Sequence, residues 1–312
     1  MFKLYDVLLS TLSFTLRVLP IVFFGMLASE VLLGFGLLKR LEKIGRPLTK
    51  LANLPDVCGI AFVTAIGSPT ASNAMLQDLR EEGVLKDREV LLSSILNSTV
   101  VPLKETFTYH LPVILPMLGL YVGGVYVATL WLGTAALLIF VIVCSRLILD
   151  GRSVAVEMVI DCKHFSFKLA LRKTLKKFER IGIIFVVVTF CTFTLMSVGL
   201  IDRTETLLLP IAKALNLPSI AIPAIVTYIA SPIVGFSMFG SLLQSGAICE
   251  EDAIISLLLG SVFMLPILYI RFHFPQWISI FGLRLGLLRG LISLSLMMVT
   301  RVVVLLLFLK IY

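Results

Sequence analysis

Long uncharged apolar runs constrain this chain more than any other feature of its sequence. Residues 111–145 contain no acidic or basic side chain, and neither do residues 181–201 or 253–270. A helix that crosses the hydrocarbon layer needs about 20 mainly apolar residues, because that layer is about 30 Å thick. Only 15% of the residues are charged, against roughly a quarter in soluble domains. The sequence therefore predicts an all-α integral membrane protein with several spans.

The longest of these runs is too long for one upright helix. We expect the chain to break within it. The candidate breaks are Pro112, Pro116, Gly123 and Gly124.

The sequence also repeats itself with a shift of 163 residues. Residues 47–98 align without a gap on residues 210–261, with 17 identities in 52 positions. The matches include prolines, a lysine, an asparagine and a glycine in register, which apolar composition alone would not produce. We therefore predict two related halves, residues 1–150 and 164–312, joined by a linker at 151–163.

Basic residues are distributed differently over the equivalent loops of the two halves. Residues 39–50 and 78–89 carry five and three Lys or Arg, whereas their counterparts 202–213 and 241–252 carry two and none. Basic loops face the cytoplasm, so equivalent loops are expected on opposite sides, as in an inverted-topology repeat.

The same rule predicts a multi-pass protein of the cell membrane whose segment 146–180, with nine basic residues, is cytoplasmic. Arg271, Arg284 and Arg289 are assigned to the inner surface as well. The net charge of +8 thus indicates cytoplasmic loops and a lipid bilayer as partner, not nucleic acid. A homo-oligomer is compatible with this organisation, and the sequence does not decide the oligomeric state.

Each half contains a helix that is interrupted about halfway across the membrane. Residues 55–66 would form about 18 Å of helix, which ends at Gly67-Ser68-Pro69-Thr70 because glycine and proline break it. The second half repeats this plan around Ser231 and Pro232. We predict two re-entrant broken hairpins, residues 55–79 and 218–243. Ordinary kinked helices packed on their neighbours are the alternative.

Paired breaks in an inverted repeat are typical of the central site of a transporter, because main-chain groups freed in lipid need protein or a watery cavity. Amides in hydrocarbon need partners for both ends, so Asn73 and Asn97 are favoured ligands, whereas a lone Ser or Thr more often bonds its own helix. The substrate-binding candidates are Thr64, Gly67, Ser68, Thr70, Ser72, Asn73, Asn97, Ser98, Thr227, Ser231, Ser237 and Ser261.

Two charged residues fall inside predicted spans, Glu30 and Arg301. An ionisable group at that depth is a functional candidate by default. Glu30 is predicted either to carry a coupling proton or to pair with Arg301 or another cation.

The sequence predicts no metal site, no cofactor and no enzymatic activity. Its five cysteines stand singly, and no pair has metal-ligand or redox spacing. It contains no paired-histidine metal motif, nucleophile elbow or carboxylate pair at membrane depth.

The two broken segments resemble the nucleoside recognition, or Gate, domain. The residues that carry the resemblance are Ala65-Ile-Gly-Ser-Pro-Thr70 and Tyr228-Ile-Ala-Ser-Pro-Ile233, followed by Gly83 and Gly246. It covers residues 47–103 and 210–270. That domain occurs in ferrous iron transporter B, in concentrative nucleoside transporters, in spore maturation proteins and as stand-alone membrane proteins.

The resemblance implies a stand-alone permease that moves a small polar solute, nucleoside-like or an ion, through a central site between the hairpins. The chain lacks the Gly-x-x-x-x-Gly-Lys-Ser/Thr motif of a GTP-binding domain, and it lacks the cysteine-bearing gate of the iron transporter. A divalent metal (Fe²⁺) permease is one alternative. A non-transporting scaffold or accessory subunit is another, supported by the basic segment 163–180, which could dock an acidic protein or anionic lipids.

Overall fold

The computed structural model describes residues 46–149, 167–197, 208 and 210–311, together with most positions between 5 and 27. These parts form helices, and no strand occurs among them. Within the described parts, three helical stretches are long and apolar enough to cross a membrane, namely Leu120–Ile148, Glu250–Phe281 and Leu283–Ile311. The protein is an all-α membrane protein, as the sequence predicts. The linker 151–163 and Glu30 lie outside the described residues.

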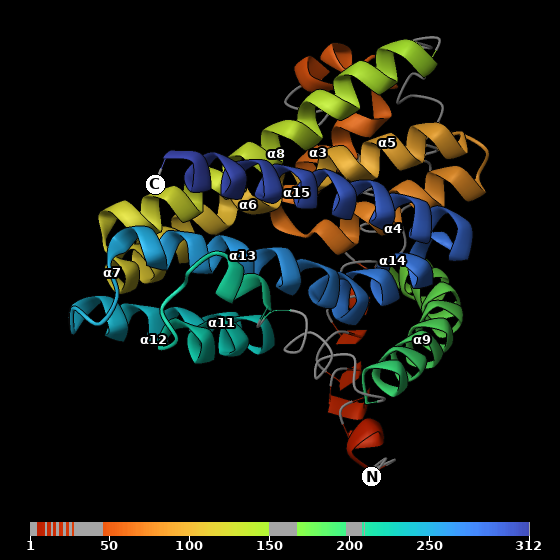
Figure 1. Cartoon of the computed structure of the whole chain (residues 1–312). Helices are drawn as coiled ribbons and strands as arrows, with labels where there is room; N and C mark the ends of the chain where they lie inside the picture. The colour runs from red at the N-terminus through yellow and green to blue at the C-terminus, as the bar shows by residue number, and fades with distance from the viewer. Residues whose placement is uncertain are drawn as a thin grey trace.

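The two halves contain equivalent helices in the same order, except that one helix of the second half spans the positions of two in the first (Figure 1). The first half consists of α3 (Val57–Gly67), α4 (Pro69–Glu81), α5 (Asp87–Ser98), α6 (Val100–Glu105), the π-helix η1 (Thr106–Ile114), α7 (Leu115–Leu118) and α8 (Leu120–Ile148). After α9 (Phe167–Ser197), the second half consists of α11 (Ala221–Ala230), α12 (Pro232–Gln244), α13 (Glu250–Leu268), η3 (Tyr269–His273), α14 (Phe274–Phe281) and α15 (Leu283–Ile311).

Left-handed backbone positions recur at the spacing of the sequence repeat. The pairs, each 163 residues apart, are Asn53 and Asn216 (φ 52° in both), Gly83 and Gly246 (74° and 69°), and Gly119 and Gly282 (80° and 82°). Positive φ is rare outside glycine and asparagine. The backbone of the two halves therefore turns at the same places.

Both hairpin helices break at a serine in extended conformation. Ser68 has φ −149° and ψ 107°, and Ser231 has φ −148° and ψ 99°. A proline begins the next helix in each case, where its missing N–H removes no helical hydrogen bond. The Ser68 Oγ also accepts a hydrogen bond from the Ala71 N–H at 3.2 Å, which caps α4. The breaks lie within the two segments expected from the sequence.

The 35-residue uncharged run also breaks, but at none of the four expected residues. Its break falls at Gly119, where φ is 80°. Pro112 is instead accommodated inside the π-helix η1. Gly123 lies within α8, and a Cβ there would come 3.2 Å from the Leu115 Cα. This glycine therefore allows α7 and α8 to pack closely after the chain turns back.

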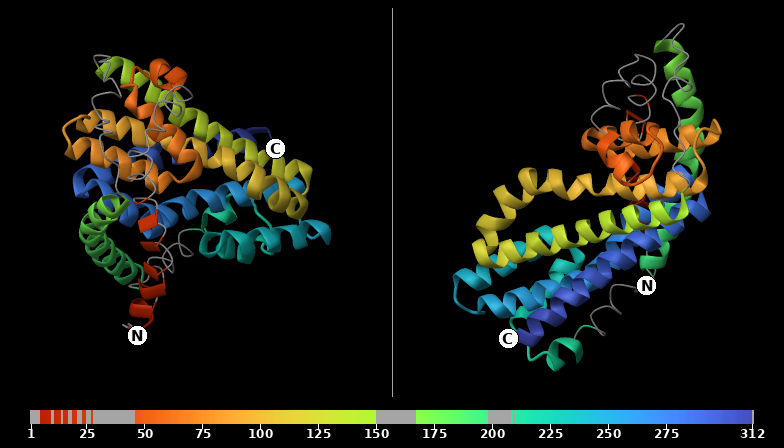
Figure 2. Two further views of the ribbon diagram at one scale, coloured as in Figure 1. Left: turned by 180° about the vertical axis from the view of Figure 1, so that it is seen from behind. Right: turned by 90° about the horizontal axis from the view of Figure 1, so that it is seen from above.

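The long helices α5, α8, α13 and α15 pack side by side. The loop between α4 and α5 lies at one end of this bundle, and the loop between α12 and α13 lies at the opposite end (Figures 1 and 2). Helix α9 packs against α14 at the same end as the α4–α5 loop. Among the described residues, the two large hydrophobic clusters of the core lie one around each hairpin.

The hairpins themselves lie apart in the molecule (Figures 1 and 2). Helices α3 and α4 pack on α5 and α14, whereas α11 and α12 pack on α13 and α7. The structure therefore does not place the two breaks on opposite sides of one shared cavity, which was the arrangement expected from the sequence.

Two glycines, Gly235 in the second hairpin and Gly260 on the following helix α13, make room for the fully buried Tyr228 of that hairpin. A Cβ on Gly260 would lie 2.8 Å from the Tyr228 Cδ1, and a Cβ on Gly235 would run into the Tyr228 backbone. The Tyr228 ring packs edge to face on Phe236 at 5.1 Å, and its hydroxyl bonds the Tyr126 hydroxyl at 3.3 Å. The interior of this hairpin is therefore filled by aromatic rings.

Replacing Gly260 by alanine should destabilise the protein by about 1–3 kcal/mol, because the new methyl group overpacks the Tyr228 ring. The midpoint of thermal unfolding in detergent measures this. Gly124→Ala is the matched control, since no atom lies within 4 Å of its added Cβ. Equal midpoints for the two variants would contradict the close fit around Tyr228.

Candidate functional site

A buried amide joins the first hairpin to the helix that follows it. The Asn97 Nδ2 on α5 donates a hydrogen bond of 2.6 Å to the Ser72 Oγ on α4. Asn97 and Ser72 are 1% and 0% exposed. Asn73 follows Ser72 on α4. The Oδ1 atoms of Asn97 and Asn73 have no partner among the described residues. An unpaired buried acceptor costs about 1–3 kcal/mol, so these oxygens would gain most from a polar ligand.

A buried arginine from the second half covers the same stretch of α5. Arg289 on α15 is 3% exposed. Its Nε donates to the Ser94 Oγ at 3.1 Å, and its Nη2 donates to the Ser94 carbonyl at 2.9 Å and the Ser98 Oγ at 2.6 Å. Its guanidinium carbon lies 3.7 Å from the centroid of the Trp277 ring, a cation–π contact. Arg289 is therefore buried within the protein, and its assignment to the inner side of the membrane stays a prediction.

Helix α14 ties the tip of the first hairpin to the second half. The Gln276 Nε2 donates to the Thr70 Oγ1 at 2.7 Å, and Thr70 is the second residue of α4. Next to Gln276, the Trp277 ring stacks on the His273 ring with their centroids 5.0 Å apart. Helices α4, α5, α14 and α15 together thus surround one polar cluster, made of Thr70, Ser72, Asn73, Ser94, Asn97, Ser98, Gln276 and Arg289, which we call the α5 cluster.

Five of the residues predicted from the first half, Thr70, Ser72, Asn73, Asn97 and Ser98, therefore belong to the α5 cluster. The other three serve the hairpin locally or face outward. The Thr64 hydroxyl donates to the Ile60 carbonyl of its own helix at 2.9 Å. Ser68 caps α4, and Gly67 is exposed.

The predicted residues of the second half form no such cluster. The Ser261 hydroxyl donates to the Leu258 carbonyl of its own helix at 2.7 Å. Ser237 is exposed, while Thr227 and Ser231 are half-buried. The positions equivalent to Asn73 and Asn97 hold Phe236 and Gly260. The predicted candidates that join the α5 cluster thus all come from the first half.

Arg301 is buried within α15, at 3% exposure. Its Nη1 lies 3.5 Å from the Met297 carbonyl, one turn earlier. Because Glu30 lies outside the described residues, its proposed pairing with Arg301 stays a prediction.

Sequence reasoning missed Arg289, Gln276 and Trp277 as members of the site. Arg289 carried a usable signal, because residues 285–288 and 290–300 around it contain no other charge. A cation inside an apolar run is a candidate for function at membrane depth. For Gln276 and Trp277 we find no comparable signal.

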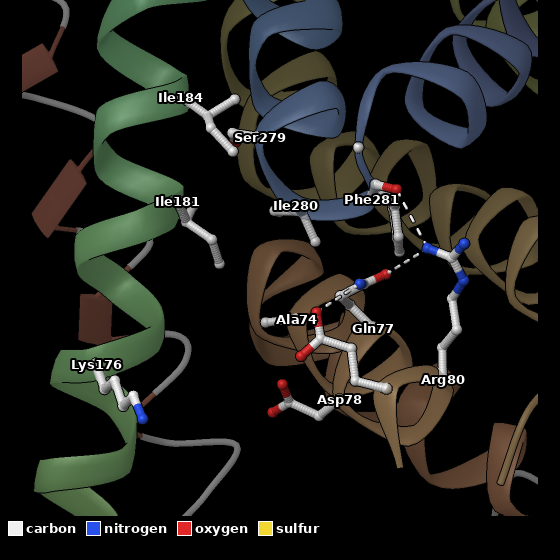
Figure 3. Close-up of a pocket in the computed structure, with 12 residues that line it drawn as sticks. Ala74, Gln77, Asp78, Arg80, Lys176, Ile181, Ile184, Ser279, Ile280 and Phe281 are labelled. Carbon is white, nitrogen blue, oxygen red and sulfur yellow. Dashed lines mark hydrogen bonds between the residues drawn. The ribbon is translucent and has the colours of Figure 1, made fainter. Parts of the chain in front are cut away.

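Apart from the α5 cluster, an open cleft lies between α4 and α9 (Figure 3). This open cleft has a volume of about 550 Å³, and Asp78, Arg80, Glu81 and Lys176 are among its lining residues. The Arg80 Nε bonds the Asp87 carboxylate at 2.7 Å, and its Nη1 bonds the Phe281 carbonyl at 3.3 Å. Arg80 therefore fastens α4 to the C-terminal end of α14, a helix end that favours a cation.

In the described part of the chain, no three His, Cys, Asp or Glu side chains come close enough together to hold a metal ion. The polar atoms of the α5 cluster are those of amides, hydroxyls and one guanidinium. Such a set forms hydrogen bonds with a polar solute in both directions, as donor and as acceptor.

Comparison with known proteins gives one family and several relatives. Residues 15–121 match the family Gate, described as nucleoside recognition. That stretch includes the first hairpin and all of α5.

The relatives are proteins of Methanocaldococcus jannaschii. The uncharacterized protein MJ0880 is 23% identical over 302 residues, which cover 95% of this chain and 97% of that protein. The uncharacterized proteins MJ1556 and MJ0871 are 26% and 27% identical, over 91% and 88% of this chain and 91% and 86% of their own lengths. No solved structure gives a significant match.

Removing the amide of Asn97 should expose how strongly α4 and α5 are coupled. Asn97→Ala and Ser72→Ala should each lower stability by about 1–3 kcal/mol, because each leaves the other partner buried and unpaired. The double variant should cost less than the sum, with a coupling of about 0.5–3 kcal/mol in thermal unfolding. Ser72→Ala combined with Ser237→Ala, an exposed position, should be additive. Additivity for the Asn97 and Ser72 pair as well would remove their bond from the argument.

Proposed function

We propose that this chain, whose residues 15–121 match the nucleoside recognition (Gate) family, is a membrane transporter of a small polar solute. The observation that carries the proposal is the α5 cluster. It places two unpartnered amide oxygens, those of Asn73 and Asn97, in the interior of a membrane protein and directly beside a helix break. Interior polar groups at such a break are typical of transport sites.

The solute lies in this proposal between the first hairpin and helices α5, α14 and α15, where the polar side chains gather. The oxygens of Asn73 and Asn97 accept hydrogen bonds from its N–H or O–H groups, and Arg289 donates to its acceptors. A nucleoside-like solute carries both kinds of group. The second hairpin, in which Tyr228 packs against Phe236, is proposed to be a rigid apolar element that does not bind the solute.

The hairpins are proposed to enter the membrane and return on the same side. Helices α3 and α4 have 11 and 13 residues, or about 17 and 20 Å, which is well short of a bilayer core of about 30 Å. Helices α11 and α12 have 10 and 13 residues. Their length and the extended serine between each pair support re-entry.

The two halves are proposed to lie in the membrane with opposite orientations. The α4–α5 and α12–α13 loops, which are equivalent in the repeat, lie at opposite ends of the bundle (Figures 1 and 2). Residues 78–89 around the first loop carry three Lys or Arg, and residues 241–252 around the second carry none. The end that carries the first loop and α9 is therefore assigned to the cytoplasm. Transport then requires the first hairpin to move against α14, which breaks the bond between Gln276 and Thr70.

Two equivalent loop positions test the opposite orientation. Lys86 and Cys249 are 163 residues apart, and both are exposed at the start of the equivalent helices α5 and α13. With the other cysteines replaced by serine, Cys249 alone should react with a membrane-impermeant maleimide from outside intact cells. A Lys86→Cys variant that also carries Cys249→Ser should react only after the cells are opened. Labelling of both from the same side would rule out the inverted arrangement.

Uptake into proteoliposomes tests transport itself, with radiolabelled uridine, adenosine, acetate and Fe²⁺ as the panel. Asn73→Leu should reduce uptake of the transported member at least tenfold, because leucine fills the space without offering a hydrogen bond. Its unfolding midpoint should stay unchanged or rise, since the Asn73 oxygen bonds no described residue and an unpaired buried amide destabilises. The exposed Ser237→Ala is the control. Uptake by no member of the panel above empty liposomes would favour the accessory-subunit alternative.

A further inference from the structure

We propose that the solute bound by the α5 cluster carries an oxyanion, a carboxylate or a phosphate, and that Arg289 is its ligand. This inference rests on the proposed function and narrows its substrate class. It begins from the guanidinium of Arg289, a group that proteins normally keep charged and that is 3% exposed here.

The partners of this guanidinium are all neutral. They are the Ser94 hydroxyl and carbonyl, the Ser98 hydroxyl and the Trp277 ring. None of the carboxylates that the structure describes forms an ion pair with Arg289, and the recorded ion pairs join Arg46 to Asp56 and Arg80 to Asp87. A buried charge without a counter-charge is costly by several kcal/mol. An anionic ligand would remove much of that cost.

Arg289 and two serines on α15 and α5 have unpartnered buried groups that could bind an oxyanion. Nε and Nη2 are occupied by α5, whereas Nη1 has no partner among the described residues. Two buried hydroxyls are unpartnered in the same way: Ser293, one turn beyond Arg289 on α15, and Ser93, beside Ser94 on α5. Hydroxyls and the planar guanidinium are the groups that proteins use to bind carboxylate and phosphate oxygens. The Trp277 ring fixes the guanidinium plane, so little side-chain freedom is lost on binding.

The cation has no counterpart in the other half. The repeat places Tyr126 at the position equivalent to Arg289, and Leu257 at the position equivalent to Ser94. Both halves nevertheless build equivalent helices in the same order. The fold alone therefore does not require an arginine here, which is the pattern expected of a ligand-binding group.

The chain supplies its own reporter for the test. It contains two tryptophans, Trp131 and Trp277, and Trp277 lies directly under the Arg289 guanidinium. In a Trp131→Phe background, the fluorescence of the purified full-length protein in nanodiscs therefore reports on Trp277. Sodium acetate and sodium phosphate are titrated as probes, with neutral acetamide as the uncharged match of acetate and sodium chloride as the control for ionic strength.

We expect a saturable fluorescence change with acetate, with phosphate or with both, which distinguishes the two sources of the oxyanion. Acetamide and chloride should give none. In Arg289→Gln the affinity should fall at least tenfold, and in Arg289→Lys, which keeps the charge but loses the fork, it should fall less. Arg284→Gln, an exposed position on the same helix, should bind as the parent does.

Several results would overturn the inference. The first is no saturable response to either oxyanion, and the second is a response that chloride or acetamide reproduces. The third is unaltered binding in Arg289→Gln. A fourth is that adding Glu30→Gln to the Arg289→Gln variant restores its folding and uptake, because Glu30 would then be the internal counter-charge of Arg289. Oxyanion binding without uptake would refute the transport proposal alone. Uptake of a neutral solute that survives Arg289→Gln would refute this inference alone.

Discussion

In a bilayer core, every main-chain N–H and C=O needs a partner within the protein, and this requirement shapes the whole molecule. The chain ends its helices in the middle of apolar segments at Ser68 and Ser231, and at both places the next helix begins with proline. At Ser68 the serine hydroxyl supplies one cap, and Gln276 reaches the first turn of the new helix from the other half. Polar side chains therefore collect where the backbone is interrupted.

The two halves share a backbone plan and differ in what fills it. Around the first hairpin, Ser72 and Asn97 form a buried hydrogen bond. The second half has Gly235 and Gly260 at the equivalent positions; Gly260 admits the Tyr228 ring, and Gly235 admits the Tyr228 backbone. The hydroxyl of Tyr228 has a hydrogen-bond partner in Tyr126. In the first half, the side-chain oxygens of Asn73 and Asn97 have no partner among the described residues. The second half thus has an interior packed with aromatic rings, and the first half has a polar interior.

Sequence reasoning predicted the parts of this structure that depend on local chemistry. Proline after serine located both helix breaks, and residue type selected Asn73 and Asn97. Prediction from the sequence failed where contacts with other parts of the chain determine the structure. Pro112 was expected to break a helix, but the π-helix η1 accommodates it and the turn falls at Gly119 instead. Arg289 and Gln276 bond residues about 190 to 206 positions away, and such pairings follow from packing rather than from any local pattern.

The described hydrogen bonds that reach the α5 cluster from outside α4 and α5 come from the second half. Gln276 bonds Thr70, and Arg289 bonds Ser94 and Ser98. A displacement of one half against the other must therefore break hydrogen bonds inside the cluster, and a ligand that replaces them changes the balance between the two arrangements. A transporter needs this coupling, because solute binding must alter the free energy of the movement that exposes the site to the other side. The polar groups could not serve that purpose if the cluster lay within a single half.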